Sequence, residues 1–103
     1  MALVTFRSRA ASAIIMYAES AQRLLDIIGK PMTERGVITS EQVEQALARL
    51  LEAIEREKAA AAAAGDGDTP GNERPISLRQ RAFPLVEMLR AARKRHVDVT
   101  WGI

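Results

Sequence analysis

The sequence has 103 residues, a formal net charge of +2 and a pI of about 9.5, with 48% hydrophobic and 27% charged residues. These values are typical of one globular domain with one modest core. The chain has no cysteine, which excludes disulfides, zinc knuckles and thiol chemistry. The first residues lack the apolar run of a signal peptide, and no stretch approaches the ~18 apolar residues of a membrane span. We therefore expect a cytoplasmic protein with no membrane partner.

The N-terminal third predicts a strand and then a helix. Residues 3–7, Leu-Val-Thr-Phe-Arg, combine β-branched and aromatic side chains and predict a short strand. Ser12, or Ser8 before it, is the expected N-cap of the helix, and Gly29 is placed for a left-handed C-cap. Apolar residues at three- and four-residue steps predict the helix itself: Ile14, Tyr17, Ala18, Ala21, Leu24, Leu25 and Ile28.

Two apolar residues fall outside the main stripe of this predicted helix. Met16 and Ile27 are eleven residues apart, which would place them on one side of the helix. They are either scattered exposed residues, which are normal, or a dimer contact.

The middle of the chain predicts a long helix. Residues 36–39, Gly-Val-Ile-Thr, are either a short second strand or the entry to this helix. Thr39 and Gln42 have capping-box spacing, and Ser40 is the alternative N-cap. A second apolar stripe follows: Val43, Ala46, Leu47, Leu50 and Ile54. Alanine has the highest helix propensity, so we expect the helix to run into residues 59–64.

A glycine- and aspartate-rich stretch follows the alanines and has no side chain able to fill a core. The residues after it are too few to bury a core alone. We therefore expect a single domain over residues 1–103, with a flexible Ala/Gly/Asp loop at about residues 59–73.

The last part predicts a third helix and a closing strand. Ser77 and Gln80 have capping-box spacing. The apolar stripe of the helix comprises Leu78, Ala82, Leu85, Val86, Leu89 and Ala92. Val97, Val99 and Trp101 then alternate with polar residues and glycine, which predicts a strand. Trp101 is either a core residue of this strand or an exposed anchor for a partner.

Pro84 lies within the segment that predicts the third helix, and its position has two interpretations. In one continuous helix it would cost ~3 kcal/mol unless the helix kinks. The first interpretation is a turn over Leu78–Ala82, a bend, and a helix that continues from Phe83, with Phe83 and Leu78 packed in the bend. The second is a binding patch of Arg79, Arg81 and Phe83, because arginine beside an aromatic residue suits anionic or protein partners.

The C-terminal end of this stripe is basic. Arg90, Arg93, Lys94, Arg95 and His96 are either a solvated helix end that complements the helix dipole or a patch that contacts phosphates. A nucleic-acid partner is disfavoured, because the four aromatic residues do not form a stacking pattern and no nucleic-acid-binding motif is present.

The sequence predicts no catalytic, cofactor-binding or metal-binding residue. His96 is the only histidine, and no nucleophile elbow, zinc-helix motif or phosphate-binding loop accompanies it. The carboxylates of residues 65–68 lack the spacing and the closing glutamate of a calcium loop.

Several segments together resemble a small bacterial domain-of-unknown-function family of single-domain proteins about the length of this chain. The segments are LVTFRSRAA, RLLDIIGK, RGVIT, ALARLLEAIEREK, SLRQRAFPLVEML and DVTWG, and SLRQRAFPL is the most specific. The resemblance covers most of the chain except about residues 59–73. It implies a bacterial, soluble, stand-alone protein and assigns no activity.

We therefore predict an α+β fold in which three main helices pack on a small two- or three-stranded sheet. The predicted order is strand, helix, short strand, helix, helix, strand, with the first and last strands paired. The predicted function is a non-catalytic binding or protein-interaction module with a basic C-terminal surface. The alternative is a small enzyme, with its cleft between the strands and the third helix, or a nucleic-acid-associated protein.

The expected partner is an unknown protein or an anionic ligand, and a homodimer is a further alternative. The residues expected to bind it are Arg79, Arg81, Phe83, Arg90, Arg93 and Lys94.

Overall fold

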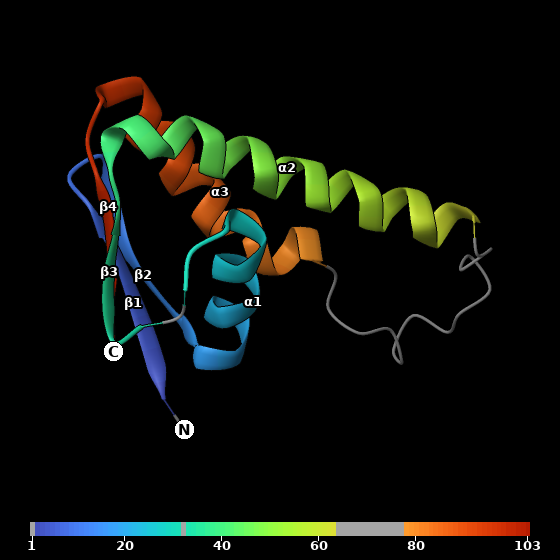
Figure 1. The fold of residues 1–103 in the computed structure, drawn as a ribbon, viewed down its shortest axis with the longest axis horizontal. Helices are drawn as coiled ribbons and strands as arrows, with labels where there is room; N and C mark the ends of the chain where they lie inside the picture. Colours follow the sequence, from blue (N-terminus) through green and yellow to red (C-terminus); the bar gives the residue numbers. More distant parts are fainter. Residues whose placement is uncertain (1, 32, 64–77) are drawn as a thin grey trace.

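The computed structural model describes residues 2–31, 33–63 and 78–103, which form three helices and one four-stranded sheet (Figure 1). Every strand pairing is antiparallel, so the α+β prediction is confirmed. The elements in chain order are β1 (Leu3–Ser8), β2 (Ala11–Tyr17), α1 (Ala18–Ile28), β3 (Arg35–Ile38), α2 (Ser40–Ala63), α3 (Leu78–Arg95) and β4 (Val99–Gly102).

The sheet has the strand order β2-β1-β4-β3, and the three helices lie on one side of it (Figure 1). The first and last strands are neighbours, as predicted, with Phe6 opposite Trp101. Because side chains alternate along a strand, Val4 and Phe6 point into the core while Leu3 and Thr5 point away from the helices. The sheet therefore has one buried face and one open face.

The prediction of a two- or three-stranded sheet, and of a helix capped at Ser12 or Ser8, is wrong. Ala11–Tyr17 form β2, which pairs with β1 in a hairpin, and α1 begins only at Ala18. The first part of the predicted helix is thus a strand, so the order of elements begins with two strands. Ile14 and Ala18 are four residues apart and fit both a helical and an alternating pattern, and pairing with β1 decides between them.

This correction also removes the geometric reason for a dimer contact at Met16 and Ile27. Met16 lies in β2 and Ile27 in α1, so they do not share a helix face. Both are half-buried against the core. A homodimer itself remains a prediction, and it needs another surface.

The end of α1 follows the sequence prediction. Gly29 is the C-cap, with a left-handed φ of 94°. The Arg49 guanidinium of α2 donates a hydrogen bond of 2.8 Å to the backbone carbonyl of Ile28. Glycine is needed here for this left-handed conformation, and a Cβ on residue 29 would also displace the Arg49 guanidinium.

The start of α2 combines a local cap with a distant one. The Thr39 N–H donates to Gln42 Oε1 over 3.2 Å, which is the backbone half of the predicted capping box. The Ser40 N–H donates to Asp98 Oδ1, just before β4, over 2.6 Å. These bonds satisfy two of the N–H groups that a helix start leaves unpaired.

α3 is one continuous helix through Pro84, so the predicted separate turn over Leu78–Ala82 is wrong. Leu78 and Ala82 before the proline, and Leu85 and Leu89 after it, are buried in the same core. Packing on both sides of Pro84 holds the helix together, and Pro84 itself is exposed. Ser77, the predicted N-cap, lies outside the described residues.

The core lies between the helices and the inner face of the sheet. Trp101 is only 4% exposed, which confirms it as a core residue. Its ring lies over Gly36 of β3, where any Cβ would overlap it, and its Nε1–H donates to the Thr33 carbonyl over 3.3 Å. Phe6 completes this cluster, with ring centroids 6.5 Å apart. Gly36 is therefore the residue that makes room for the tryptophan.

α2 extends through Ala63, in agreement with the prediction that it runs into the alanine stretch. The rest of the predicted loop, from residue 64 to 73, lies outside the described residues. Among the described helices, none combines the length and apolar character that crossing a membrane requires.

Candidate functional site

A groove of about 590 Å³ runs between α2 and α3. Its lining comes from residues spaced three or four apart along each helix, so each helix contributes one continuous flank. The lining residues are Leu51, Ile54, Glu55 and Lys58 of α2, and Arg79, Phe83, Val86, Glu87 and Arg90 of α3. Because Arg79 and Arg90 are eleven residues apart, the groove extends over about three helical turns.

The apolar part of the groove comes from side chains that the core does not fully cover. Leu50 is the last fully buried residue in the part of α2 whose side chains are described. Beyond it, Leu51 and Ile54 are only half-buried. From α3, Val86 is buried but the Phe83 ring is 58% exposed. A partner could therefore remove substantial apolar surface from water by entering this groove.

The groove also carries charges of both signs. Arg90 Nε lies 3.6 Å from Glu87 Oε2, and both side chains are more than half exposed, so this pair contributes little to stability. No ion pair involves Arg79 or Lys58 among the described residues. With Arg90 and Glu87 paired, the two remaining cations outnumber Glu55, the one remaining carboxylate.

The structure brings three of the six predicted binding residues together in the groove and leaves the other three outside it. Arg79, Phe83 and Arg90 lie together in the groove, as their helical spacing indicates. Arg81 is two residues from both Arg79 and Phe83 and therefore lies on a different side of α3. Arg93 and Lys94 are in the last turn of the helix. The three-residue patch of Arg79, Arg81 and Phe83 is thus not one surface.

Phe83 does not pack against Leu78, which corrects the predicted bend. Leu78 is 4% exposed and Phe83 is 58% exposed. In a continuous helix Phe83 falls on the flank of Arg79 and Arg90, beside the buried stripe rather than within it. An exposed aromatic ring next to a cation is a typical anchor for a partner.

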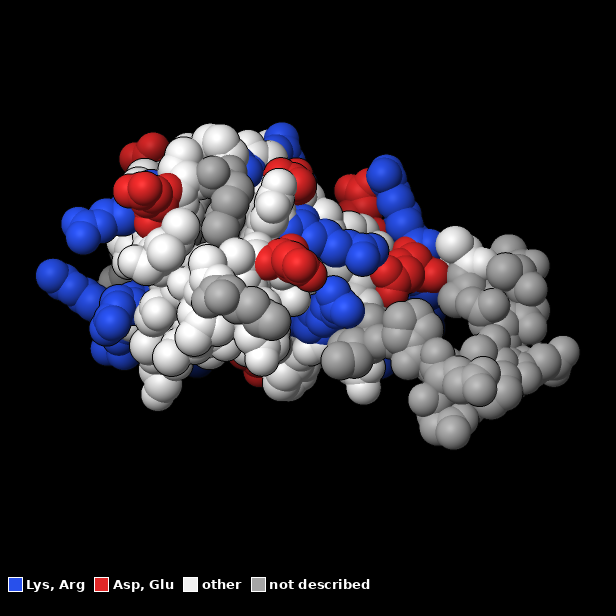
Figure 2. All heavy atoms as spheres, turned by 90° about the horizontal axis from the view of Figure 1, so that it is seen from below, with Lys and Arg blue, Asp and Glu red and all other residues white. Residues whose placement is uncertain are grey.

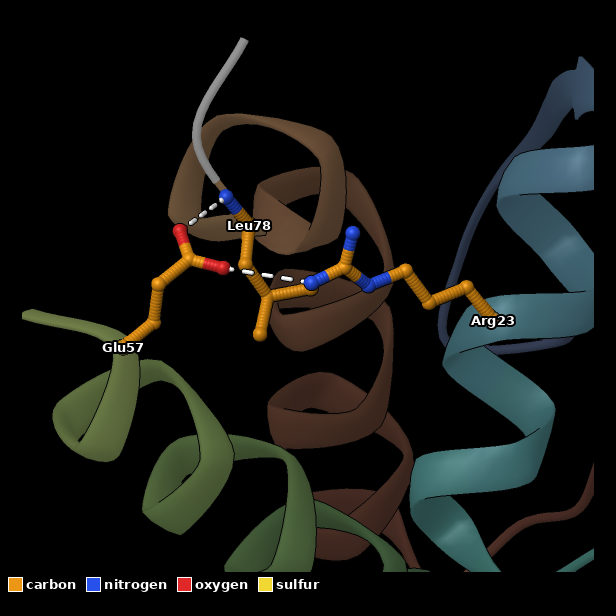
Figure 3. Close-up of polar contacts among 3 residues, drawn as sticks. All are labelled: Arg23, Glu57 and Leu78. Atoms are coloured by element: carbon orange, nitrogen blue, oxygen red, sulfur yellow. Dashed lines mark hydrogen bonds and ion pairs between the residues drawn. The ribbon is translucent and has the colours of Figure 1, made fainter. Parts of the chain in front are cut away.

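Glu57 links the two helices that form the groove (Figure 3). Its Oε1 accepts the N–H of Leu78, the first residue of α3, over 2.8 Å. Its Oε2 lies 3.3 Å from Nη2 of Arg23 in α1. One carboxylate thus caps the start of α3 and links three helices. The sequence shows Glu57 as an ordinary exposed helix charge, so its role could not be predicted.

A second hollow of about 570 Å³ lies at the basic end of α3. It is lined by Arg7, Ser8, Arg9, His96, Val97, Asp98 and Thr100. Arg7 and Arg9 could not be assigned to this end of α3 from the sequence, because only the pairing of β1 with β4 brings them there. The hollow is open to solvent, and one of its polar groups, Asp98, already accepts the Ser40 N–H.

The end of α3 has the geometry of a capped helix. His96 is left-handed, with φ of 56°, and the Val97 N–H donates to the Ala92 carbonyl over 3.1 Å. The cations Arg93, Lys94 and Arg95 stand in this last turn, where they complement the helix dipole.

Charges of both signs are mixed on the molecular surface seen in Figure 2, where Lys and Arg side chains alternate with Asp and Glu along the helical part. A partner that binds this face would therefore recognise the local arrangement of charged side chains rather than an electrostatic field of one sign. Among the described residues, no group of three His, Asp or Glu side chains is placed to hold a metal ion.

Comparison with known families matches residues 2–101 to a domain of unknown function (DUF1840). The match covers nearly the whole chain, so the protein belongs to this family. It confirms the resemblance drawn from the sequence segments and assigns no activity. No curated protein and no solved structure matches the chain.

Proposed function

We propose that this member of the DUF1840 family is a non-catalytic protein-interaction module that docks an acidic, apolar segment of another protein between α2 and α3. The observation that carries the proposal is Phe83, which is 58% exposed in a groove that also contains Arg79. Aromatic residues and arginine are enriched in protein–protein interfaces, so an exposed phenylalanine beside an arginine suits a partner-binding surface.

The shape of the groove favours an elongated partner. Its lining spans about two turns of α2, from Leu51 to Lys58, and about three turns of α3, from Arg79 to Arg90, which suits a short amphipathic helix. Such a helix places apolar residues along one face and docks them into a groove between helices. Leu51, Ile54 and Phe83 would contact that face.

The charge of the groove favours carboxylates on the partner. Arg79 and Lys58 have no ion pair among the described residues, whereas Glu87 is engaged by Arg90. A carboxylate near Arg79 could form a two-pronged contact with its guanidinium. An acidic segment therefore complements this groove better than a basic one.

The test compares two arginines on different sides of one helix. We would purify native complexes on the wild-type chain and on the variants Arg79→Ala, Phe83→Ala and Arg81→Ala, and quantify every co-purifying protein. A partner of the groove is lost from the first two variants and retained by Arg81→Ala. If no protein shows this pattern, the groove is not the docking surface.

A second candidate function is the binding of a phosphate-bearing ligand at the basic end of α3. The observation that favours it is the hollow in which Arg7 and Arg9 meet His96. Salt-dependent retention on heparin or DNA that is lost in the double variant Arg7→Ala, Arg9→Ala would support it. Retention that is unchanged by the double variant would remove this candidate.

We also propose that the module acts in the bacterial cytoplasm. A chain without cysteine is compatible with a reducing compartment. Localisation of a tagged chain in cell fractions tests this proposal.

A further inference from the structure

A third hollow, of about 310 Å³, lies where the end of α1 meets the first turns of α2. Its lining comes from the end of α1 and the residues after it, from the end of β3, and from one side of α2. The polar side chains in this lining are Lys30, Gln42, Gln45 and Arg49. The volume is at the lower end of the range for ligand pockets, so the hollow suits a small ligand.

The side chains of the third hollow carry positive charge and no negative charge. Glu55 and Glu87 line the groove between α2 and α3, and Asp98 lines the hollow at the end of α3, whereas no Asp or Glu of the described residues lines the third hollow. Neither Lys30 nor Arg49 forms an ion pair within the described part of the chain. Two cations therefore share this hollow without a carboxylate to balance them.

Both cations are held by hydrogen bonds that use only part of their donor capacity. Lys30, which is half-buried, donates from Nζ to Gln42 Oε1 over 2.7 Å, and an ammonium has three N–H donors. Arg49 donates from Nη1 to the Ile28 carbonyl over 2.8 Å, and a guanidinium has five. Each positive group is thus positioned by the protein and can still donate to a ligand.

The two glutamines of the hollow add further donors. Gln42 Oε1 accepts from Lys30 and from the Thr39 N–H, so both of its lone pairs are used and its NH₂ group remains to donate. Gln45 forms no hydrogen bond with the described residues, so its amide can turn to suit a ligand. The polar groups of the hollow are therefore suited to a ligand that accepts hydrogen bonds.

Helix capping explains only part of this arrangement. A cation at a helix C-terminus complements the helix dipole, and the Arg49 contact with Ile28 serves that purpose for α1. One cation and one N–H are enough for this role. It does not explain the ammonium of Lys30, which bonds to Gln42 of α2 rather than to a carbonyl of α1.

We infer that the third hollow binds a small oxyanion, in the form of a phosphate or carboxylate group, through Lys30 and Arg49. A guanidinium can donate two parallel N–H bonds to the oxygens of such a group, and an ammonium adds a compact positive charge. The third hollow shares no lining residue with the groove between α2 and α3 or with the hollow at the end of α3. The inference therefore stands or falls independently of the proposed function.

The first test titrates the wild-type chain with inorganic phosphate and, separately, with succinate, at pH 7 and constant ionic strength. Two-dimensional NMR follows the backbone N–H of Gly29 and Lys30 and the Nε–H of Arg49. We expect saturable shifts at these groups, with a dissociation constant of about 1 mM or lower for at least one anion.

The two anions distinguish the possible ligands. Saturation by phosphate alone indicates a phosphate ligand, saturation by succinate alone indicates a carboxylate ligand, and saturation by both indicates a site that takes either group. If neither anion gives saturable shifts at Gly29, Lys30 and Arg49, the inference is wrong.

The variant Gln45→Glu places a negative charge in the hollow and keeps both cations with their hydrogen bonds. Residue 45 is exposed and glutamate is a good helix former, so the variant should fold. We expect the dissociation constant to rise at least about tenfold, because the new carboxylate repels the anion and competes for the cations. Gln22→Glu, the same change at an exposed position of α1 outside the lining, is the matched control. Equal affinities of the two variants overturn the inference.

A second pair of variants tests the ammonium and separates this site from the groove. Lys30→Gln removes a cation from the third hollow, and Lys58→Gln removes one from the groove between α2 and α3. We expect Lys30→Gln to weaken binding of the anion and Lys58→Gln to leave it unchanged. Unless Lys30→Gln has the larger effect, the anion does not bind in the third hollow.

Discussion

Glu57 in α2 and Leu78 at the start of α3 are joined by a hydrogen bond of 2.8 Å between the carboxylate and the backbone N–H (Figure 3). The first N–H groups of a helix have no partner within the helix, and a carboxylate placed there also complements the helix dipole. This contact holds α3 against α2 at the end of the groove where Arg79 lies.

We expect Glu57→Ala to lower the free energy of unfolding by about 1 kcal/mol, the usual loss for a helix cap. Glu57→Gln keeps an acceptor for the Leu78 N–H but loses the charge opposite Arg23, so its effect should be smaller. Glu52→Ala, which removes only an exposed ion pair with Arg56, is the control and should cost about 0.5 kcal/mol or less. Urea unfolding measures all three. Equal effects of the alanine variants would contradict the capping role of Glu57.

Gly36 and Gly102 allow a matched test of packing around Trp101. A Cβ on residue 36 would overlap the Trp101 ring, whereas a Cβ on residue 102 would meet its nearest atoms at 3.7 Å. We expect Gly36→Ala to destabilise the protein by about 1–3 kcal/mol through overpacking. Gly102→Ala should change stability by about 0.5 kcal/mol or less.

Tryptophan fluorescence checks the cause of this difference, because Trp101 is the only tryptophan. The emission of Gly36→Ala should shift toward that of an exposed indole, and the emission of Gly102→Ala should not. Identical spectra for both variants would show that the environment of the Trp101 ring does not depend on Gly36.

Pro84 should limit the stability of α3. It lies inside a continuous helix, supplies no N–H and is exposed to solvent. Pro84→Ala should therefore raise the free energy of unfolding, by up to about 3 kcal/mol. Thermal unfolding followed by far-UV circular dichroism measures the gain. A lower melting temperature would show that the proline conformation is needed for the packing of α3.

Phe83 and Leu89 on the same helix should respond differently to truncation. Leu89 is fully buried, so Leu89→Ala should cost about 2–5 kcal/mol. Phe83 is 58% exposed, so Phe83→Ala should change stability by about 0.5 kcal/mol or less. Chemical unfolding measures the free energy of unfolding of both variants. A large loss for Phe83→Ala would mean that the ring supports the fold and would weaken its assignment as a docking anchor.

Much of the architecture could be predicted from local patterns. The stripes of α2 and α3, the left-handed Gly29 and the capping contact of Thr39 with Gln42 all follow from spacing and residue type. These features depend on contacts within a few residues or on one clear periodicity, which a single sequence contains.

The candidate site was predicted in part for the same reason. Arg79, Phe83 and Arg90 share a flank because helical spacing places them there. The other wall of the groove, with Leu51 and Ile54, could not be assigned, because the packing of α2 against α3 depends on residues far apart in the chain.

Sequence by itself determined the helical stripes of α2 and α3, the left-handed cap at Gly29 and the absence of thiol chemistry, because these depend on residue type and short-range spacing. Only the tertiary structure decided that Ala11–Tyr17 is a strand, that α3 passes unbroken through Pro84 and that Glu57 joins α2 to α3. The physical reason is that a weak local preference yields to hydrogen bonds and burial supplied by distant segments.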